Sequence, residues 1–233
     1  MIKRTGELKP TEEWTKEQLL EMVKSHNKSL QHQTYLETVN QTKFNEIKKH
    51  HHATLYQAMK DGKADWPIMK LCKRIDQKKH YFTSSSCSGR ILLLQLEEDE
   101  HKRPGGFLTK WHRTVKWNEL EQALQQPVDG KFVWFKQEAL ILHLGCDTME
   151  SAEKLLLLCR VAGLKRFGIQ STHPGKIMVE ILGTRNMYFL VKEKNKILCD
   201  DTFLKIQLKK ANEKFKQNEQ LIKTLERVFK KLE

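Results

Sequence analysis

The sequence FTSSSCSGRI, residues 82–91, places six hydroxyl or thiol side chains in one run between two apolar segments. Around this run the helical pattern gives way to strands at Tyr81–Thr83 and Arg90–Leu96, with a tight turn of Ser, Cys and Gly between them. Gly89 permits close backbone approach, and Arg90 offers a planar fork of donors that suits a carboxylate or phosphate. The residues alone equally favour a Ser-rich hairpin turn in which Arg90 forms a surface salt bridge.

The segment before this run has the pattern of helices. Apolar residues recur at helical spacing from Phe44 to Lys60, and Asp65 then caps another helix that has Pro67 in its first turn. Nearer the start, Thr15 and Gln18 have capping-box spacing for a helical arm. The N-terminal quarter is therefore expected to be helical.

The segment after the run mixes short strands with helices. Apolar residues from Leu204 to Leu232 follow a nearly unbroken three-four alternation, which predicts a long helix packed on its own domain, with a coiled-coil dimer as the alternative. The expected elements before it are a solvated loop at 97–106, strands at 107–114, 132–135, 139–144, 169, 177–182 and 187–191, and helices at 117–126 and from a cap at Asp147 to Gly163.

This pattern predicts the fold class α+β (mixed α/β), with a mixed sheet, a long C-terminal helix and a non-Rossmann arrangement. No Gly-x-Gly-x-x-Gly loop follows a strand. We expect residues 1–43 to form an N-terminal helical extension and residues 44–233 to form the main domain. The chain is expected to be a monomer or a homodimer.

Composition limits the partners. The net charge of +13 favours a polyanionic partner, although a basic excess in the last thirty residues equally suits a solvated helix surface. The five cysteines show no paired spacing, so we expect reduced thiols, with no metal site and no disulfide framework. The apolar runs are too short for a membrane span, and a soluble, cytoplasmic protein without membrane contact is expected.

Ser85–Arg90 resembles the Ser-Ser-Cys-Ser-Gly-Arg signature of the wybutosine-synthesising protein 3 family. The similarity runs from about Phe44 to Glu233. Departures occur at Asp76, where the family often has Asn, at Ser84, where Thr is usual, and at Phe167, where Ser is expected. Other matching elements follow in the family's order, namely Asp65, Ile68 and Leu71, then Trp111-His112, Ile141-Leu142-His143, Ala162-Gly163, Gly168-Ile169 and Gly183-Thr184.

The resemblance implies an enzyme that transfers a methyl group from S-adenosyl-L-methionine. Its implied target is N4 of 7-(3-amino-3-carboxypropyl)-4-demethylwyosine, the base 3′ of the anticodon in phenylalanine tRNA. The basic charge leaves a noncatalytic tRNA-binding protein as the main alternative, and the tail pattern leaves a helical interaction module as a third.

Methyl transfer depends mainly on alignment of the methyl group with the nucleophilic nitrogen, so positioning groups are the first candidates. Among them, His112 and His143 are expected in strands, where either could accept a proton or hydrogen-bond the base. Residues expected to bind cofactor or base are Ser85, Ser86, Cys87, Ser88, Gly89, Arg90, Trp111 and Gly168. Residues expected to contact RNA are Lys209, Lys210, Lys216 and Lys223.

Overall fold

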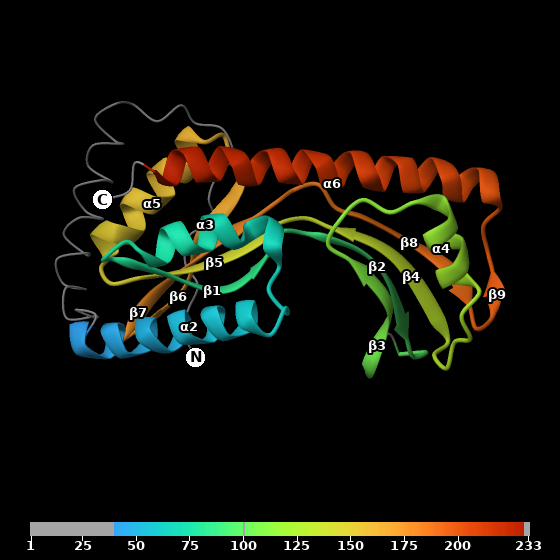
Figure 1. Ribbon diagram of the computed structural model, residues 1–233, viewed down its shortest axis with the longest axis horizontal. Helices are drawn as coiled ribbons and strands as arrows, with labels where there is room; N and C mark the ends of the chain where they lie inside the picture. The colour runs from blue at the N-terminus through green and yellow to red at the C-terminus, as the bar shows by residue number, and fades with distance from the viewer. Residues whose placement is uncertain (1–39, 100, 231–233) are drawn as a thin grey trace, which may run out of the picture. The chain divides into compact units, whose positions relative to one another are not determined.

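The computed structural model describes residues 40–99 and 101–230 (Figure 1). The expected helical arm around Thr15 lies outside these residues. The fold class is α+β, as expected, with helices before the first strand and a long helix after the last. The helices are α2 (Gln41–Lys60), α3 (Trp66–Asp76), α4 (Trp117–Leu124), α5 (Met149–Val161) and α6 (Asp201–Phe229). The strands are β1 (Tyr81–Cys87), β2 (Arg90–Leu96), β3 (Lys102–Trp111), β4 (Phe132–Glu138), β5 (Ile141–Cys146), β6 (Arg166–His173), β7 (Lys176–Leu182), β8 (Met187–Glu193) and β9 (Lys196–Ile197).

The strands form two antiparallel sheets, whereas one mixed sheet was expected. The first sheet has the order β1-β5-β7-β6 and the second has the order β3-β2-β4-β8-β9. The expected hairpin turn at the Ser-rich run is also wrong. Ser84–Cys87 belongs to β1, which pairs with β5, whereas β2 pairs with β3 and β4 in the other sheet. The chain therefore changes sheets at Ser88-Gly89.

The chain crosses between the sheets three times, and the three crossings meet at Asn218 of α6. They lie at residues 88–89, 139–140 and 183–186. The buried Asn218 amide donates to the carbonyl of Ser88 and accepts a hydrogen bond from the amide of Leu140 at 3.0 Å. The amide of Gly183 in turn donates to the Leu140 carbonyl at 2.8 Å. Asn218 thus holds two of the crossings directly, and the third is held through Leu140.

Each sheet has its own hydrophobic core, and α6 contributes to both. Leu208 and Phe215 pack in the core of the second sheet, whereas Ile222 and Phe229 pack in the core of the first. Figure 1 shows α6 running along both sheets, with α2 on the other side of the first sheet. The tail therefore packs on its own domain, as the apolar alternation predicted. Among the described helices, none is long and apolar enough to cross a membrane.

Two of the boundaries that differ from the expected ones have a clear physical reason. The strand β3 begins at Lys102 inside the expected loop, because the chain turns back directly from β2 and Leu96 pairs with Lys102. The N-cap of α5 is Thr148 rather than Asp147. The Asp147 carboxylate instead contacts His80 at 2.6 Å, which leaves the adjacent hydroxyl to cap the helix.

Candidate active site

Asp65 connects the start of α3 to the Ser-rich run. It occupies the N-cap position, yet its side chain makes no capping hydrogen bond. Its carboxylate instead accepts hydrogen bonds from the Ser88 amide at 2.5 Å and from the Ser88 hydroxyl at 2.8 Å. The same carboxylate lies 3.1 Å from Nδ1 of His112, and Sγ of Cys87 lies 3.8 Å from that nitrogen. We call Asp65, Cys87, Ser88 and His112 the acid–histidine cluster.

Electrostatics in the acid–histidine cluster favour a charged pair. The hydrogen bond to Asp65, reinforced by Cys87, raises the pKa of His112 to about 10 despite partial burial. Burial acts to raise the pKa of Asp65, but the hydrogen bonds from His112 and Ser88 outweigh it and lower this pKa. At neutral pH the His112 ring is therefore a cation that donates hydrogen bonds. In this charged state the ring cannot accept a proton.

The donor atoms of Asp65, Cys87 and His112 all lie within 4.8 Å of one another, which is close enough to hold a metal ion such as zinc. A protonated imidazole cannot ligate a metal through the nitrogen that carries the proton. The Asp65–His112 pair therefore satisfies both partners without an ion. That the protein uses no metal stays a prediction.

His112 does not lie in a strand, because β3 ends at Trp111 and His112 is in the following bend. His143 does lie in a strand, and its Nε2 is 2.9 Å from Oε1 of Glu180, its cross-strand neighbour on β7. Glu180 also pairs in register with Gly168 on β6. A side chain at Gly168 would meet no atom within 4 Å, so the sheet is open there.

The two histidines lie near the same face of the first sheet. Cys87 of the acid–histidine cluster is opposite Ile141, which is two residues from His143 on β5. Opposite residues and residues two apart on a strand point to the same face. A cavity of about 330 Å³ extends along this sheet beside Glu180 and β6. One sheet face thus carries a thiol, a histidine–carboxylate pair and an open glycine.

The other residues of the run point in different directions. Ser85 is exposed, whereas the Ser86 hydroxyl is buried and has no hydrogen-bond partner among the described residues. Arg90 donates from Nε to Glu138 at 2.7 Å and lies 5.1 Å from the Phe107 ring centre. This is the salt-bridged arrangement that the residues had left open. Arg90 therefore belongs to the second sheet rather than to the acid–histidine cluster.

Gly89 allows the chain to pack closely against the protein's own backbone and side chains, rather than against a ligand. Its φ is +99°, and a Cβ there would lie 2.3 Å from Nδ2 of Asn218 and 2.7 Å from the Glu138 carbonyl oxygen. Trp111 packs against the core of the second sheet, and Phe167 packs against the core of the first. These placements give Gly89, Trp111 and Phe167 structural contacts.

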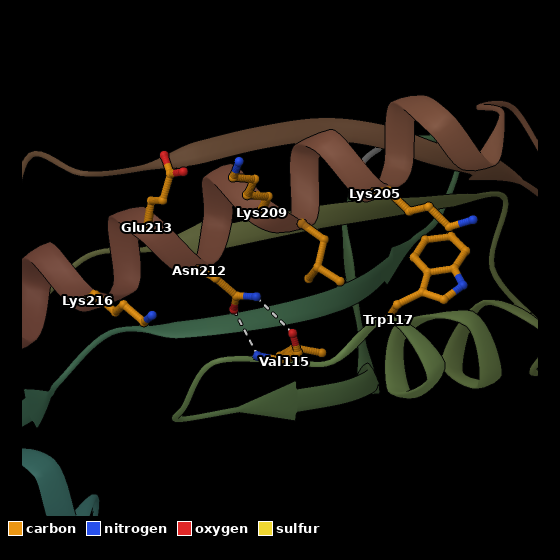
Figure 2. Close-up of a pocket in the computed structure, with 8 residues that line it drawn as sticks. Val115, Trp117, Lys205, Lys209, Asn212, Glu213 and Lys216 are labelled. Atoms are coloured by element: carbon orange, nitrogen blue, oxygen red, sulfur yellow. Dashed lines mark hydrogen bonds between the residues drawn. The ribbon is translucent and has the colours of Figure 1, made fainter.

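The four expected RNA-binding lysines do not all lie at one site. Lys209 and Lys216 line a groove beside α4, which Figure 2 shows. Lys210 forms an ion pair with Glu213 at 2.9 Å. Lys223 is exposed further along α6. Only two of the four therefore share one depression in the surface.

Two residues of the candidate site were missed in the sequence. Asp65 was assigned as a helix cap in a segment that resembles the family, without a role in the site, and nothing in the local pattern indicates its contact with Ser88, which is distant in the sequence. Glu180 gave a usable signal, since it is the only charged residue in the apolar run Ile177–Leu182. A charge at that place in a strand requires a partner, which here is His143.

Comparisons with known proteins agree with this architecture. Residues 40–231 match the protein family described as "Methyltransferase TYW3". The chain is 33% identical to the tRNA(Phe) 7-((3-amino-3-carboxypropyl)-4-demethylwyosine(37)-N(4))-methyltransferase 1 of Pyrococcus abyssi, over 81% of this chain and 97% of that protein. It is 32% identical to a Methanocaldococcus jannaschii methyltransferase of the same name without the numeral, over 77% of this chain and 93% of that protein.

A solved structure shows the same fold. The PH1069 protein of Pyrococcus horikoshii has a TM-score of 0.76 at 33% identity, and the match covers 82% of this chain and 96% of that one. The fold and these matches together define a methyltransferase that is not built on the Rossmann fold. The chain belongs to the TYW3 methyltransferase family. This confirms the resemblance found at Ser85–Arg90 and favours an enzyme over a noncatalytic tRNA-binding protein.

Proposed function

We propose that this protein methylates N4 of 7-(3-amino-3-carboxypropyl)-4-demethylwyosine in phenylalanine tRNA, with S-adenosyl-L-methionine as the methyl donor and the cytoplasm as its location. The observation that carries this proposal is the family match over residues 40–231. Relatives whose names state this target nucleoside align over more than nine-tenths of their own length. The net charge of +13 suits an RNA substrate.

The acid–histidine cluster has the chemistry to hold the methyl donor. S-adenosyl-L-methionine supplies a methyl group bound to a sulfonium, and its methionine part carries an ammonium and a carboxylate. The Asp65 carboxylate suits an ammonium or a hydroxyl group, and the charged His112 suits a carboxylate. Cys87 is the third residue of the proposed binding surface. The carboxylate of the base's amino-carboxypropyl arm is the other group that His112 suits.

The remaining residues of the run have smaller roles in the proposal. Ser85 is exposed and is available to either ligand. Arg90 lies next in the chain to the Ser88-Gly89 crossing, and we retain it as a contact for a carboxylate at the border of the second sheet. The hydroxyl of Ser86 is buried, so its contribution is to the strand and not to a ligand.

A proton must leave N4 as the bond from nitrogen to the methyl carbon forms, because the bond from that carbon to the donor's sulfur breaks and leaves a neutral thioether while the nitrogen would otherwise keep the positive charge. We assign its acceptor as His143, because this ring contacts Glu180 at 2.9 Å and a carboxylate stabilises the imidazolium that results. His112 is already protonated, so it donates and does not accept. Gly168 leaves the space beside Glu180 open for a planar base. The two expected catalytic histidines therefore have opposite roles in the proposal.

Two measurements on the same preparation test the proposed function. Calorimetric titration with S-adenosyl-L-methionine should show binding by the wild-type protein, and Asp65→Asn should weaken it while the protein stays folded. Mass spectrometry of nucleosides from tRNA that carries the unmethylated base should show a gain of one methyl group. Binding without methyl transfer to this base would refute the assigned substrate. Absence of binding would refute the assigned donor.

A further inference from the structure

A groove of about 480 Å³ lies between α6 and the segment that leads into α4 (Figure 2). Lys205, Lys209 and Lys216 line it from α6, and Trp117 lines it from α4. Figure 2 shows the three lysines extending from α6, the indole ring beside Lys205, and the Asn212 side chain hydrogen-bonded to Val115. We call this site the lysine groove.

The lysine groove is cationic because its ammonium groups are only partly neutralised. Lys209 and Lys216 have no ion-pair partner among residues 40–99 and 101–230. Lys205 lies 3.7 Å from an Asp201 carboxylate oxygen and 4.6 Å from the Trp117 ring centre. The one acidic residue of the groove, Glu213, is paired with Lys210. A ligand of this groove should therefore be an anion.

The basic surface continues along α6 beyond the groove. Lys223 and Arg227 follow Lys216 at intervals of seven and four residues, and Lys205 and Lys209 precede it at the same kinds of interval. Such spacing keeps all five side chains on one face of a helix, and all five are exposed. From Lys205 to Arg227 this face is about 33 Å long. A single small anion would use only a fraction of it, whereas a polyanion can follow it.

A short stretch of chain links the lysine groove to the acid–histidine cluster. The Asn212 side chain donates to the Val115 carbonyl and accepts from the Val115 amide, both at 2.8 Å, and so fixes the loop against α6. Val115 is only three residues after His112, so their Cα atoms are at most about 11 Å apart. An RNA whose target base faces a methyl donor held at the cluster has its neighbouring phosphates within reach of the groove.

We propose that the lysine groove binds phosphates of the tRNA strand next to the target nucleotide, an inference that rests on the proposed function. The groove binds phosphates rather than a stacked base, because Lys205 already covers the Trp117 ring. Such contacts carry no sequence information and instead fix the register of the RNA. The groove thereby positions the target base at the first sheet.

The test compares two double variants that remove the same charge. Lys209→Gln with Lys216→Gln alters the groove, whereas Lys79→Gln, just before β1, with Lys214→Gln, on the opposite side of α6, removes two lysines outside it. Affinity for phenylalanine tRNA is measured over a range of salt concentrations without the methyl donor. Loss of two phosphate contacts should weaken binding on the order of 20-fold at 0.15 M salt and flatten the log–log salt slope by about 1.4 to 1.8. The control pair should change both quantities far less.

Equal effects of the two double variants, or no effect of either, would overturn the groove assignment. These outcomes are distinct from failure of the proposed function, because tRNA binding is measured without methyl transfer. A wild-type protein that binds tRNA through the groove and yet does not methylate it would refute only the proposed function.

Discussion

At the residue scale, Asp65 holds the acid–histidine cluster together. A carboxylate at an N-cap ordinarily accepts from the first turn of its own helix, but Asp65 contacts Ser88 and His112 instead. The helix thereby gives up a capping bond, whose usual contribution is about 1 kcal/mol. In exchange, the α3 start, the sheet crossing and the end of β3 are fixed to one another. Asp65→Asn would keep the shape of this side chain and remove its charge.

The charged state of His112 gives a pH-dependent contribution to stability. Its pKa in the folded protein, about 10, lies above the ordinary value of 6.5, so the contribution is fully present below pH 6.5 and is lost as the pH rises through 10. We therefore predict that His112→Gln lowers the free energy of unfolding most near pH 6 and least above pH 10. Urea unfolding of both proteins across this range measures the difference. A difference that is independent of pH would mean that His112 is neutral in the folded state.

His143 should affect the rate of methyl transfer more than RNA binding. We predict that His143→Asn slows single-turnover methylation at saturating tRNA by about 10² to 10⁴, the scale of a lost general base. Affinity for tRNA should stay nearly unchanged, because most of it comes from phosphate contacts. Glu180→Gln should slow the reaction less, since it only weakens the support of the ring. A lower melting temperature with an unchanged rate would make His143 a structural residue.

At the scale of elements, periodicity predicted the helices and most of the strands but not their partners. The apolar alternation from Leu204 to Leu232 predicted α6, because a long amphipathic helix shows its buried face directly. The separation of β1 from β2 into two sheets was missed, since two short strands with Ser and Gly between them have the pattern of a hairpin. Pairing depends on distant residues such as Asn218, which no local pattern reveals.

The same limit applies to the candidate site. Ser88, Cys87 and His112 were identified through resemblance, and the structure brings them together. Asp65, which joins them, was assigned to a local role because caps are recognised from neighbouring residues alone. The face of the sheet to which a side chain points also depends on strand register, which a local pattern does not give. For this reason the Ser86 hydroxyl has no hydrogen-bond partner among the described residues, whereas the thiol of the adjacent Cys87 contacts His112.

The crossing at Gly89 should tolerate no side chain. Gly62 and Gly89 both have positive φ, but a Cβ at Gly62 would meet nothing within 4 Å, whereas one at Gly89 would overlap Asn218. We predict that Gly62→Ala costs about 1 to 2 kcal/mol of stability through backbone strain alone. Gly89→Ala should cost at least about 2 kcal/mol more, because the crossing must also move. Denaturant unfolding compares the two, and equal losses would show that Asn218 yields at no cost.

At the scale of the whole described structure, α6 packs in both hydrophobic cores, so we expect the two sheets to unfold as one cooperative unit. Phe215 is buried in the second core and Phe229 in the first. We predict that Phe215→Ala, which should cost about 3 to 5 kcal/mol, speeds amide exchange in β5 of the first sheet as much as in β4 of the second. Hydrogen-exchange mass spectrometry measures this. The exposed Leu157 provides a control, and Leu157→Ala should change neither sheet. Faster exchange in β4 alone would mean that the sheets unfold separately.

The three crossings also determine when the protein can fold during its synthesis. The strands of the two sheets alternate in groups along the chain. The first sheet therefore lacks β7 until residue 182, and the second lacks β8 until residue 193. Asn218, which holds the crossings, comes later still. A ribosome must therefore extend the chain through most of α6 before the Ser88-Gly89 turn gains its support. A nascent chain that is released early would contain every residue of the acid–histidine cluster and would still have no assembled site.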